Sequence, residues 1–162
     1  MKKKSKWFVV LMALTIVGSL TFLWAQEEEI MPEVKAAIEK LKSENPMERS
    51  EAAEILGRLR DKASLPALIG ALKDADFRVR LNAADALGNL RDKSATPALI
   101  EALNDDNDGV RISVVVALGY IRDKESVEPL IKTLRKDENE GVRISAAQVL
   151  GNLRDERAVP AL

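Results

Sequence analysis

The sequence predicts an all-α fold, a right-handed α-solenoid of antiparallel helix pairs preceded by an N-terminal apolar signal or anchor helix. Four glycines carry most of this prediction, because Gly57, Gly88, Gly119 and Gly151 are 31, 31 and 32 residues apart. Each follows a leucine and stands three residues before an Arg-Asp pair, and apolar residues between them recur at helical spacing. A fixed period of this length is typical of solenoids, in which each unit buries its apolar face against its neighbours.

Residues 1–25 have the layout of an export signal. Four of the first six residues are lysines, an apolar run extends from Trp7 to Trp24, and Ala25 precedes a polar stretch. The run is also long enough to span a bilayer. Two alternatives remain open, cleavage after Ala25 or an uncleaved membrane anchor. Both predict export, to the periplasm or the extracellular space or to the outer side of the membrane. Membrane contact is expected only through residues 7–24, if they are retained.

The remaining chain is expected to form one repeat domain. Residues 26–31, with Glu27 to Glu29, form an acidic linker, and residues 32–162 form the solenoid. Its units are expected at about 32–60, 61–91, 92–122 and 123–154, with a partial unit at 155–162. The last unit would leave an apolar face open, and solenoids end in polar caps. We therefore expect a fragment of a longer protein, or an end that another molecule covers.

Each unit is expected to contain two helices. The first is short, as at 64–73, with Pro66 in its first turn, where the missing N–H costs little. The second runs from about Asp76 to Leu90 and starts at a residue type that caps helices. Glycine inside a helix costs about 1 kcal/mol relative to alanine. Its return in every unit indicates that small residues such as Gly88 let neighbouring helices pack closely.

The composition excludes several classes of function. The chain contains no histidine and no cysteine, which excludes a Ser-His-Asp triad, a cysteine nucleophile, disulfides and the usual zinc sites. The first 25 residues hold four of the 25 basic side chains and no acidic one, so residues 26–162 carry 21 basic and 26 acidic groups, a net charge of −5. Only two aromatic residues remain there. We therefore expect no enzyme activity, no cofactor and no nucleic-acid partner.

The pattern around Gly88 resembles a known family. Its elements are Asp76, Val79-Arg80, Ala86-Leu87-Gly88, Leu90-Arg91-Asp92 and Pro97-Ala98-Leu99. They resemble HEAT repeats, in particular the short-period repeats of bilin-lyase-type proteins of phycobilisome maturation, over about residues 45–162. The resemblance implies protein–protein binding, and some family members assist chromophore attachment. An export signal departs from those members, which would work inside the cell.

Three functions are compatible with this resemblance. We expect an exported scaffold that binds a protein partner through its concave face. The alternatives are a lyase or assembly-type subunit that handles a prosthetic group, and a regulatory repeat segment of a larger, truncated protein.

Two sets of arginines recur with the repeat. One set stands eight residues before each glycine. These residues could form a basic ladder for phosphate or carboxylate ligands, or could bond the cap residue of their own or the next unit, as the HEAT resemblance implies. Because a residue repeated in every unit usually serves stacking, the structural role is favoured. The Arg-Asp pairs after the glycines are interpreted in the same way, as clamps between units. The first set, the arginine ladder, comprises Arg49, Arg80, Arg111 and Arg143.

Residues that vary between units carry the prediction for a partner site. Positions six and three before each glycine and one after it lie opposite the core on the second helix, the helix that usually lines the concave face of such repeats. In the third unit Val116 and Tyr120 are adjacent on the helix, an apolar pair typical of a hot spot. Alternatively, Val114 to Val116 overfill the packing and Tyr120 lies flat on a neighbour. The candidate partner-binding residues are Val116, Tyr120, Asn82, Asp85, Asn89, Ser113, Gln148 and Asn152, and the same rows contain Glu51, Glu54, Arg58 and Ser145.

One segment resembles the start of a calcium-binding loop. Residues 104–109 place oxygen donors at alternate positions before Gly109. The twelfth position, which needs an acidic residue for calcium, is Val115, and Asn107 already stands at a helix cap. We therefore expect no metal site.

Overall fold

The computed structural model describes residues 30–161, and the predicted signal or anchor segment lies outside them. The described residues form helices and connecting turns, with no strand among them. No helix formed by residues 30–161 combines the length and the apolar character needed to cross a bilayer. The helices are α2 (Pro32–Lys40), α3 (Pro46–Leu59), α4 (Leu65–Ala71), α5 (Phe77–Leu90), α6 (Thr96–Ala102), α7 (Asp108–Ile121), α8 (Val127–Lys136) and α9 (Glu140–Leu153). Single 3₁₀ turns at Lys62–Ser64, Lys93–Ala95 and Lys124–Ser126 precede α4, α6 and α8, and a 3₁₀ segment at Glu156–Ala161 follows α9.

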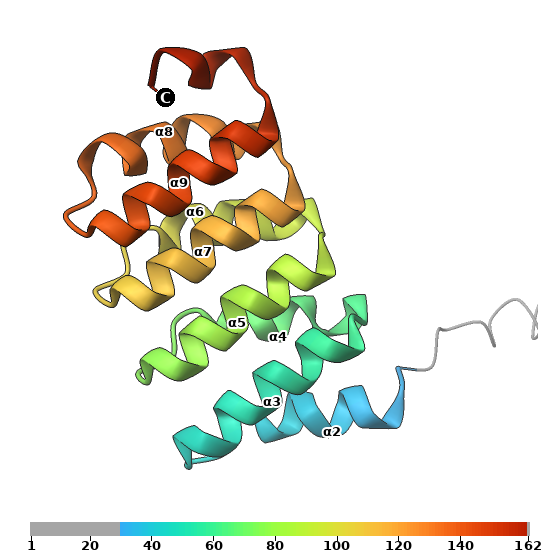
Figure 1. Cartoon of the computed structure of the whole chain (residues 1–162). Coiled ribbons are helices and arrows are strands. Elements are labelled where there is room, and N and C mark those ends of the chain that lie inside the picture. Colours follow the sequence, from blue (N-terminus) through green and yellow to red (C-terminus); the bar gives the residue numbers. More distant parts are fainter. Residues whose placement is uncertain (1–29, 162) are drawn as a thin grey trace, which may run out of the picture. The chain divides into compact units, whose positions relative to one another are not determined.

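The helices of the unit from Pro32 onward form two layers (Figure 1). The long helices α3, α5, α7 and α9 lie side by side in one layer, and α2, α4, α6 and α8 lie behind them. Each long helix packs directly on the next, whereas each short helix packs mainly on the long helix of its own pair. The long helices therefore form the more closely packed of the two layers.

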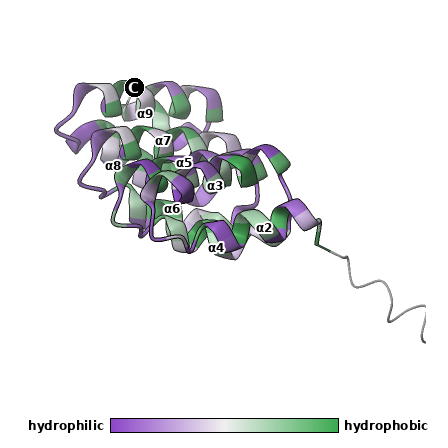
Figure 2. Cartoon of the chain, turned by 90° about the horizontal axis from the view of Figure 1, so that it is seen from below, coloured by the Kyte–Doolittle hydropathy of each residue, from purple (hydrophilic) through white to green (hydrophobic). Residues whose placement is uncertain are grey.

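The core lies between the two layers. The leucine before each glycine (Leu56, Leu87, Leu118 and Leu150) is completely buried, and so are Leu68, Leu99 and Leu130 of the short helices. Burial of one such side chain stabilises the fold by about 1.5–3 kcal/mol. The connecting loops are mostly hydrophilic (Figure 2).

The repeated glycines set the distance between long helices. A Cβ atom on Gly57 would lie 2.9 Å from the Cα of Ala86, and one on Gly88 would lie 2.9 Å from the Cα of Ala117. Gly57 and Gly88 therefore each contact an alanine of the following unit. Real Cβ atoms do not approach a backbone atom this closely, because protein interiors are already packed at high density. Glycine is therefore required at these positions by the spacing of the layer.

Polar side chains define both ends of the long helices. The helices start at cap residues whose side chains accept backbone N–H groups, as when Asp76 accepts from Arg78 at 2.9 Å. They end at arginines in the left-handed conformation, a backbone state that costs a non-glycine residue roughly 1–2 kcal/mol. The start residues are Asn45, Asp76, Asn107 and Asn139, and the end residues are Arg60, Arg91, Arg122 and Arg154, with φ of 54°, 53°, 56° and 53°.

Candidate functional site

Three members of the arginine ladder, Arg49, Arg80 and Arg111, each join the loop of their own unit to the loop of the next. Arg80 donates from Nε and Nη2 to the two carboxylate oxygens of Asp105, at 2.7 and 2.8 Å, and from Nη1 to the carbonyl of Asp74 at 3.0 Å. Arg49 binds Asp74 in the same two-pronged way at 2.7 and 2.8 Å. Arg111 binds Asp137 at 2.9 and 3.0 Å. Such bidentate contacts fix orientation as well as position.

The acid partner differs from the expected one. The carboxylate belongs to the residue two before the helix cap, and not to the cap itself. One oxygen of Asp105 also accepts the N–H of the cap residue Asn107 at 2.9 Å. Each of these aspartates therefore bonds both an arginine and the start of the next helix, which gives the arginines a structural role. Within residues 30–161, Arg143 bonds only two carbonyl oxygens, those of Asp137 and Glu138, at 2.9 and 3.0 Å.

The ladder shifts the acidity of its aspartates. The hydrogen bond from Arg49 lowers the pKa of Asp74. Burial raises the pKa of Asp105, but the hydrogen bonds from Arg80 and from the Asn107 N–H outweigh it, and the net pKa is lowered. Both carboxylates are therefore charged at neutral pH and are unavailable to a ligand.

The predicted partner residues lie along the long-helix layer, and we call them the concave strip. Asp85, Tyr120, Gln148 and Asn152 are exposed, as are Glu51, Glu54 and Arg58, whereas Asn82, Asn89, Ser113, Val116 and Ser145 are half-buried. Val114 and Val115 are fully buried and fill the core. Of the three valines, only Val116 reaches the surface.

Tyr120 is the most prominent side chain of the concave strip. It is 52% exposed although it is large and apolar. Its Cδ2 atom lies 3.4 Å from where a Cβ on Gly88 would stand, so one part of the ring rests on the preceding unit. The guanidinium of Arg91 lies 5.8 Å from the ring centroid, within the range of a cation–π contact. The ring is thus held in place while about half of it faces solvent.

Two other strip residues interact with neighbouring units. The side-chain amide of Asn82 donates to the carbonyl and the hydroxyl of Ser50, both at 3.0 Å, and so links α5 to α3. Partial burial raises the pKa of Asp85, which still contacts solvent, while the Ser113 side chain acts in the opposite direction. Asn82 is therefore partly structural, and Asp85 is a carboxylate held in surroundings that disfavour its charge.

The structure also contains a groove that the sequence analysis did not predict. It has a volume of about 820 Å³ and runs between α6 and α8, with Ile100 and Leu103 on one side and Pro129, Lys132 and Lys136 on the other. The equivalent space between α4 and α6 is about 170 Å³. Helix α8 has ten residues where α4 and α6 have seven. The sequence signal was present in the shifted Pro129 and in the extra residue of the loop 136–140.

The calcium-loop-like segment is occupied by structural contacts. Asp105 and Asp106 both bind Arg80, and Asn107 caps α7 by accepting from Val110 at 3.2 Å. Among residues 30–161, no group of three acidic side chains is arranged to hold a metal ion.

Solved structures show where this architecture occurs elsewhere. One similar structure is the complex of CpcE and CpcF of phycocyanin lyase from Nostoc sp. PCC7120, with 29% identity and a TM-score of 0.67. The match covers 77% of this chain and 54% of that one, so the chain spans about half the length of its relative. An engineered protein matches with 25% identity and a TM-score of 0.59, over 81% of this chain and 67% of the other. No curated protein sequence matches.

A family model described as HEAT repeats matches residues 34–115 and 97–162, which together make up most of the chain. The helix pairs of the chain stack as the sequence pattern predicted. The similarity of the chain to phycocyanin lyase agrees with the resemblance to bilin-lyase repeats. The chain therefore belongs to the HEAT-repeat family, with repeats of the bilin-lyase-like kind.

Proposed function

We propose that this protein is an exported HEAT-repeat scaffold that binds a protein partner through the concave strip. The observation that carries the proposal is the exposed ring of Tyr120 beside Val116 in an otherwise polar surface. Tyrosine and arginine are enriched among residues that dominate binding energy, and here Arg91 already fixes the ring. A rigid aromatic anchor loses little conformational freedom when a partner covers it.

The rest of the concave strip supports the same role. Its polar rows flank the Val116–Tyr120 pair, as a polar rim surrounds the apolar centre of an interface. Asp85 lies on the neighbouring helix, and its exposed carboxylate can accept a hydrogen bond from a partner. Family membership is consistent with this proposal, since the similar lyase structure is a complex of two proteins, CpcE and CpcF.

The double variant Val116→Ser, Tyr120→Asn tests this proposal, because it gives the third row polar side chains like those of the other rows. The matched control, Gln148→Ser with Asn152→Ser, changes the same surface one unit further along. Affinity capture from the source organism with quantitative mass spectrometry compares both with the wild-type chain. We expect a protein that the wild-type and control chains retain and the double variant loses at least about tenfold. Unchanged retention by a double variant that melts normally refutes the proposal.

Export is a separate part of the proposal. It rests on the sequence of residues 1–25, with residues 26–31 as an acidic linker to the right-handed solenoid of residues 32–162. The intact mass of the native protein tests it, since cleavage after Ala25 removes the first 25 residues. A full-length protein in the membrane fraction supports the anchored form. A full-length protein in the cytosol rejects both forms.

A second candidate function is a lyase or assembly-type subunit that handles a bilin prosthetic group. Two observations favour it, the likeness to phycocyanin lyase and the volume of the groove between α6 and α8. The groove lining holds five acidic side chains, and Lys132 and Lys136 are the lysines in it that can contact the propionates of a pigment. Titration with a bilin tests this candidate. A red shift of its absorption that Lys132→Gln and Lys136→Gln weaken supports pigment handling, and an unchanged spectrum rejects it.

A further inference from the structure

We infer that one edge of the solenoid binds an extended acidic segment of a partner protein, with carboxylates at about every third residue. This arginine edge consists of Arg60, Arg91, Arg122 and Arg154. It adds a second contact surface to the scaffold proposed above, and the two surfaces share Arg91, whose guanidinium lies over the Tyr120 ring.

The backbone of these four arginines gives the first reason. Each follows the last residue of a long helix and has a positive φ of 53–56°. Glycine adopts this conformation freely and commonly ends helices in this way, whereas an arginine is strained in it. The fold alone would therefore favour glycine four times, yet the chain places an arginine each time.

Contacts within the fold do not explain the arginines. Within residues 30–161, neither Arg60 nor Arg154 makes a side-chain hydrogen bond or ion pair. Arg122 donates once, to the carbonyl of Asn152 at 3.3 Å, and Arg91 lies over Tyr120. All four are exposed. The same backbone strain recurs four times, and at Arg60 and Arg154 no side-chain contact among residues 30–161 accompanies it, which indicates a functional role for the side chains.

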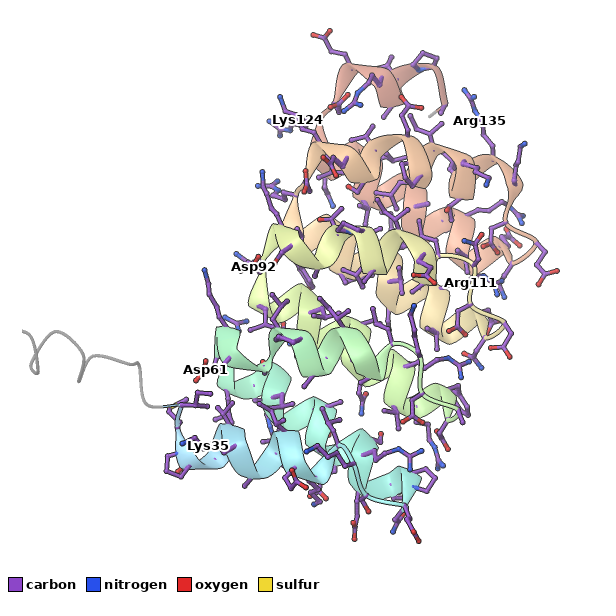
Figure 3. The ribbon with its side chains drawn as sticks, turned by 180° about the vertical axis from the view of Figure 1, so that it is seen from behind. Lys35, Asp61, Asp92, Arg111, Lys124 and Arg135 are labelled. Atoms are coloured by element: carbon purple, nitrogen blue, oxygen red, sulfur yellow. The ribbon has the colours of Figure 1, made fainter. Side chains whose placement is uncertain are left out.

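The acids beside these arginines are turned toward the backbone. Asp61 accepts the N–H of Ala63 at 2.8 Å, and Asp92 accepts that of Ser94 at 3.0 Å. Figure 3 shows Asp61, Asp92 and Lys124 following one another along one edge, with Arg111 of the arginine ladder at the opposite edge. The arginine edge therefore presents guanidinium groups to solvent, whereas the guanidinium groups of the ladder arginines form hydrogen bonds within the fold.

The repeat distance selects the ligand. Helices packed side by side are about 8–10 Å apart, so successive arginines of the edge are separated by roughly this distance. A segment in the extended polyproline II conformation rises about 3.1 Å per residue with three residues per turn, so side chains three residues apart lie on the same side and are separated by about 9 Å. A carboxylate at every third residue meets one guanidinium after another, each in a position to form a two-pronged contact.

The overall charge favours a protein segment over a dense polyanion. Residues 26–162 carry a net charge of −5, from 21 basic and 26 acidic groups, which repels nucleic acid and anionic lipid at long range. An acidic segment with one charge in three residues carries a lower charge density. Direct contacts at the arginine edge can therefore outweigh the repulsion that the whole domain exerts on it.

The test compares two twelve-residue peptides of identical composition, one with four glutamates at every third position and one with the four glutamates in a row. Fluorescence anisotropy measures their binding to the full chain in nonionic detergent. The test variant replaces Arg60, Arg91, Arg122 and Arg154 with glycine, which suits their backbone. The control variant removes four charges elsewhere, through Lys73→Gln, Lys132→Gln, Arg135→Gln and Lys136→Gln.

We expect the spaced peptide to bind at least about tenfold more tightly than the clustered one, and the glycine variant, but not the control, to lose this binding at least about tenfold. Equal binding of both peptides, or equal losses in both variants, shows simple charge attraction and overturns the proposal. Absence of peptide binding overturns it too, as does arginine-dependent binding only to single-stranded DNA or to phosphatidylglycerol vesicles. The glycine variant should melt at or above the wild-type temperature. A lower melting temperature shows that the arginines serve the fold, and this also overturns the proposal.

Discussion

One substitution, glycine to alanine, is expected to have opposite effects at equivalent positions of the repeat. At Gly88 the new methyl group would lie 2.9 Å from the Cα of Ala117, so α5 and α7 must move apart. Overpacking of this kind costs about 1–3 kcal/mol. At Gly151 nothing lies within 4 Å of the new atom among the described residues. Both sites are inside a helix, where alanine gains about 1 kcal/mol over glycine.

The gain in helix propensity from glycine to alanine is the same in both variants, so it cancels when their free energies of unfolding are compared with each other. Gly151→Ala should stabilise the fold by up to about 1 kcal/mol. Gly88→Ala should be less stable than Gly151→Ala by about 1–3 kcal/mol, the cost of overpacking alone. Urea unfolding followed by circular dichroism at 222 nm measures both free energies. Gly57→Ala repeats the test against Ala86, and Gly119→Ala should cost less because its neighbour is the side chain of Val149. If Gly88→Ala proves as stable as Gly151→Ala, the inference that α5 and α7 pack too closely at Gly88 to admit a methyl group is wrong.

Two further predictions concern the arginine ladder. Arg80→Ala leaves the buried carboxylate of Asp105 without its partner and should lower the free energy of unfolding in urea by about 3–5 kcal/mol. Arg143→Ala leaves only two carbonyl oxygens without a donor and should lower it by about 1–3 kcal/mol. Equal losses in the two variants would contradict this ranking. Because the folded-state pKa of Asp74 lies below its ordinary value of 3.8, its charge stabilises the fold above that value, and this stability is lost as the pH falls through the lowered pKa. The melting temperature should therefore drop between pH 6 and pH 3, and the drop should be smaller in Asp74→Asn; a drop of unchanged size would show that Asp74 is not responsible.

Most of the fold could be predicted from the sequence because each unit repeats the same local signals. Asp76 and Leu90 bound the second helix in the sequence, and the structure has α5 from Phe77 to Leu90 with Asp76 as its cap. The first helix was expected at 64–73, and its observed start is a 3₁₀ turn followed by α4. Pro66 fits a short helical start of either kind, so the pattern could not distinguish them.

The candidate site was less predictable, because side-chain partners depend on the distance between units. The helical wheel placed Tyr120 on the side of the helix opposite the core, and the side chain is exposed, but its contact with Arg91 of the preceding unit depends on how closely α5 and α7 pack. Asn82 was assigned to a partner, and part of its hydrogen-bonding capacity is taken by Ser50. The groove beside α8 results from a change of only a few residues, whose effect on helix length appears only after the helices are stacked.

The two sets of arginines show why recurrence alone does not reveal a role. Both sets return once in every unit, and repetition favoured a structural role for both. Arg80 uses its guanidinium donors on Asp105 and on the carbonyl of Asp74, so for the arginine ladder this interpretation is sound. Arg60 has the same periodicity, no side-chain partner within residues 30–161 and a backbone conformation that favours glycine. Stacking places equivalent exposed positions at regular intervals just as it does buried ones, so a solenoid can repeat a binding group as regularly as a structural one. What separates the two is whether the donors of the side chain are used within the fold. Among residues 30–161 the edge arginines donate one side-chain hydrogen bond in total, from Arg122, so the arginine edge is the set with donors available to a partner.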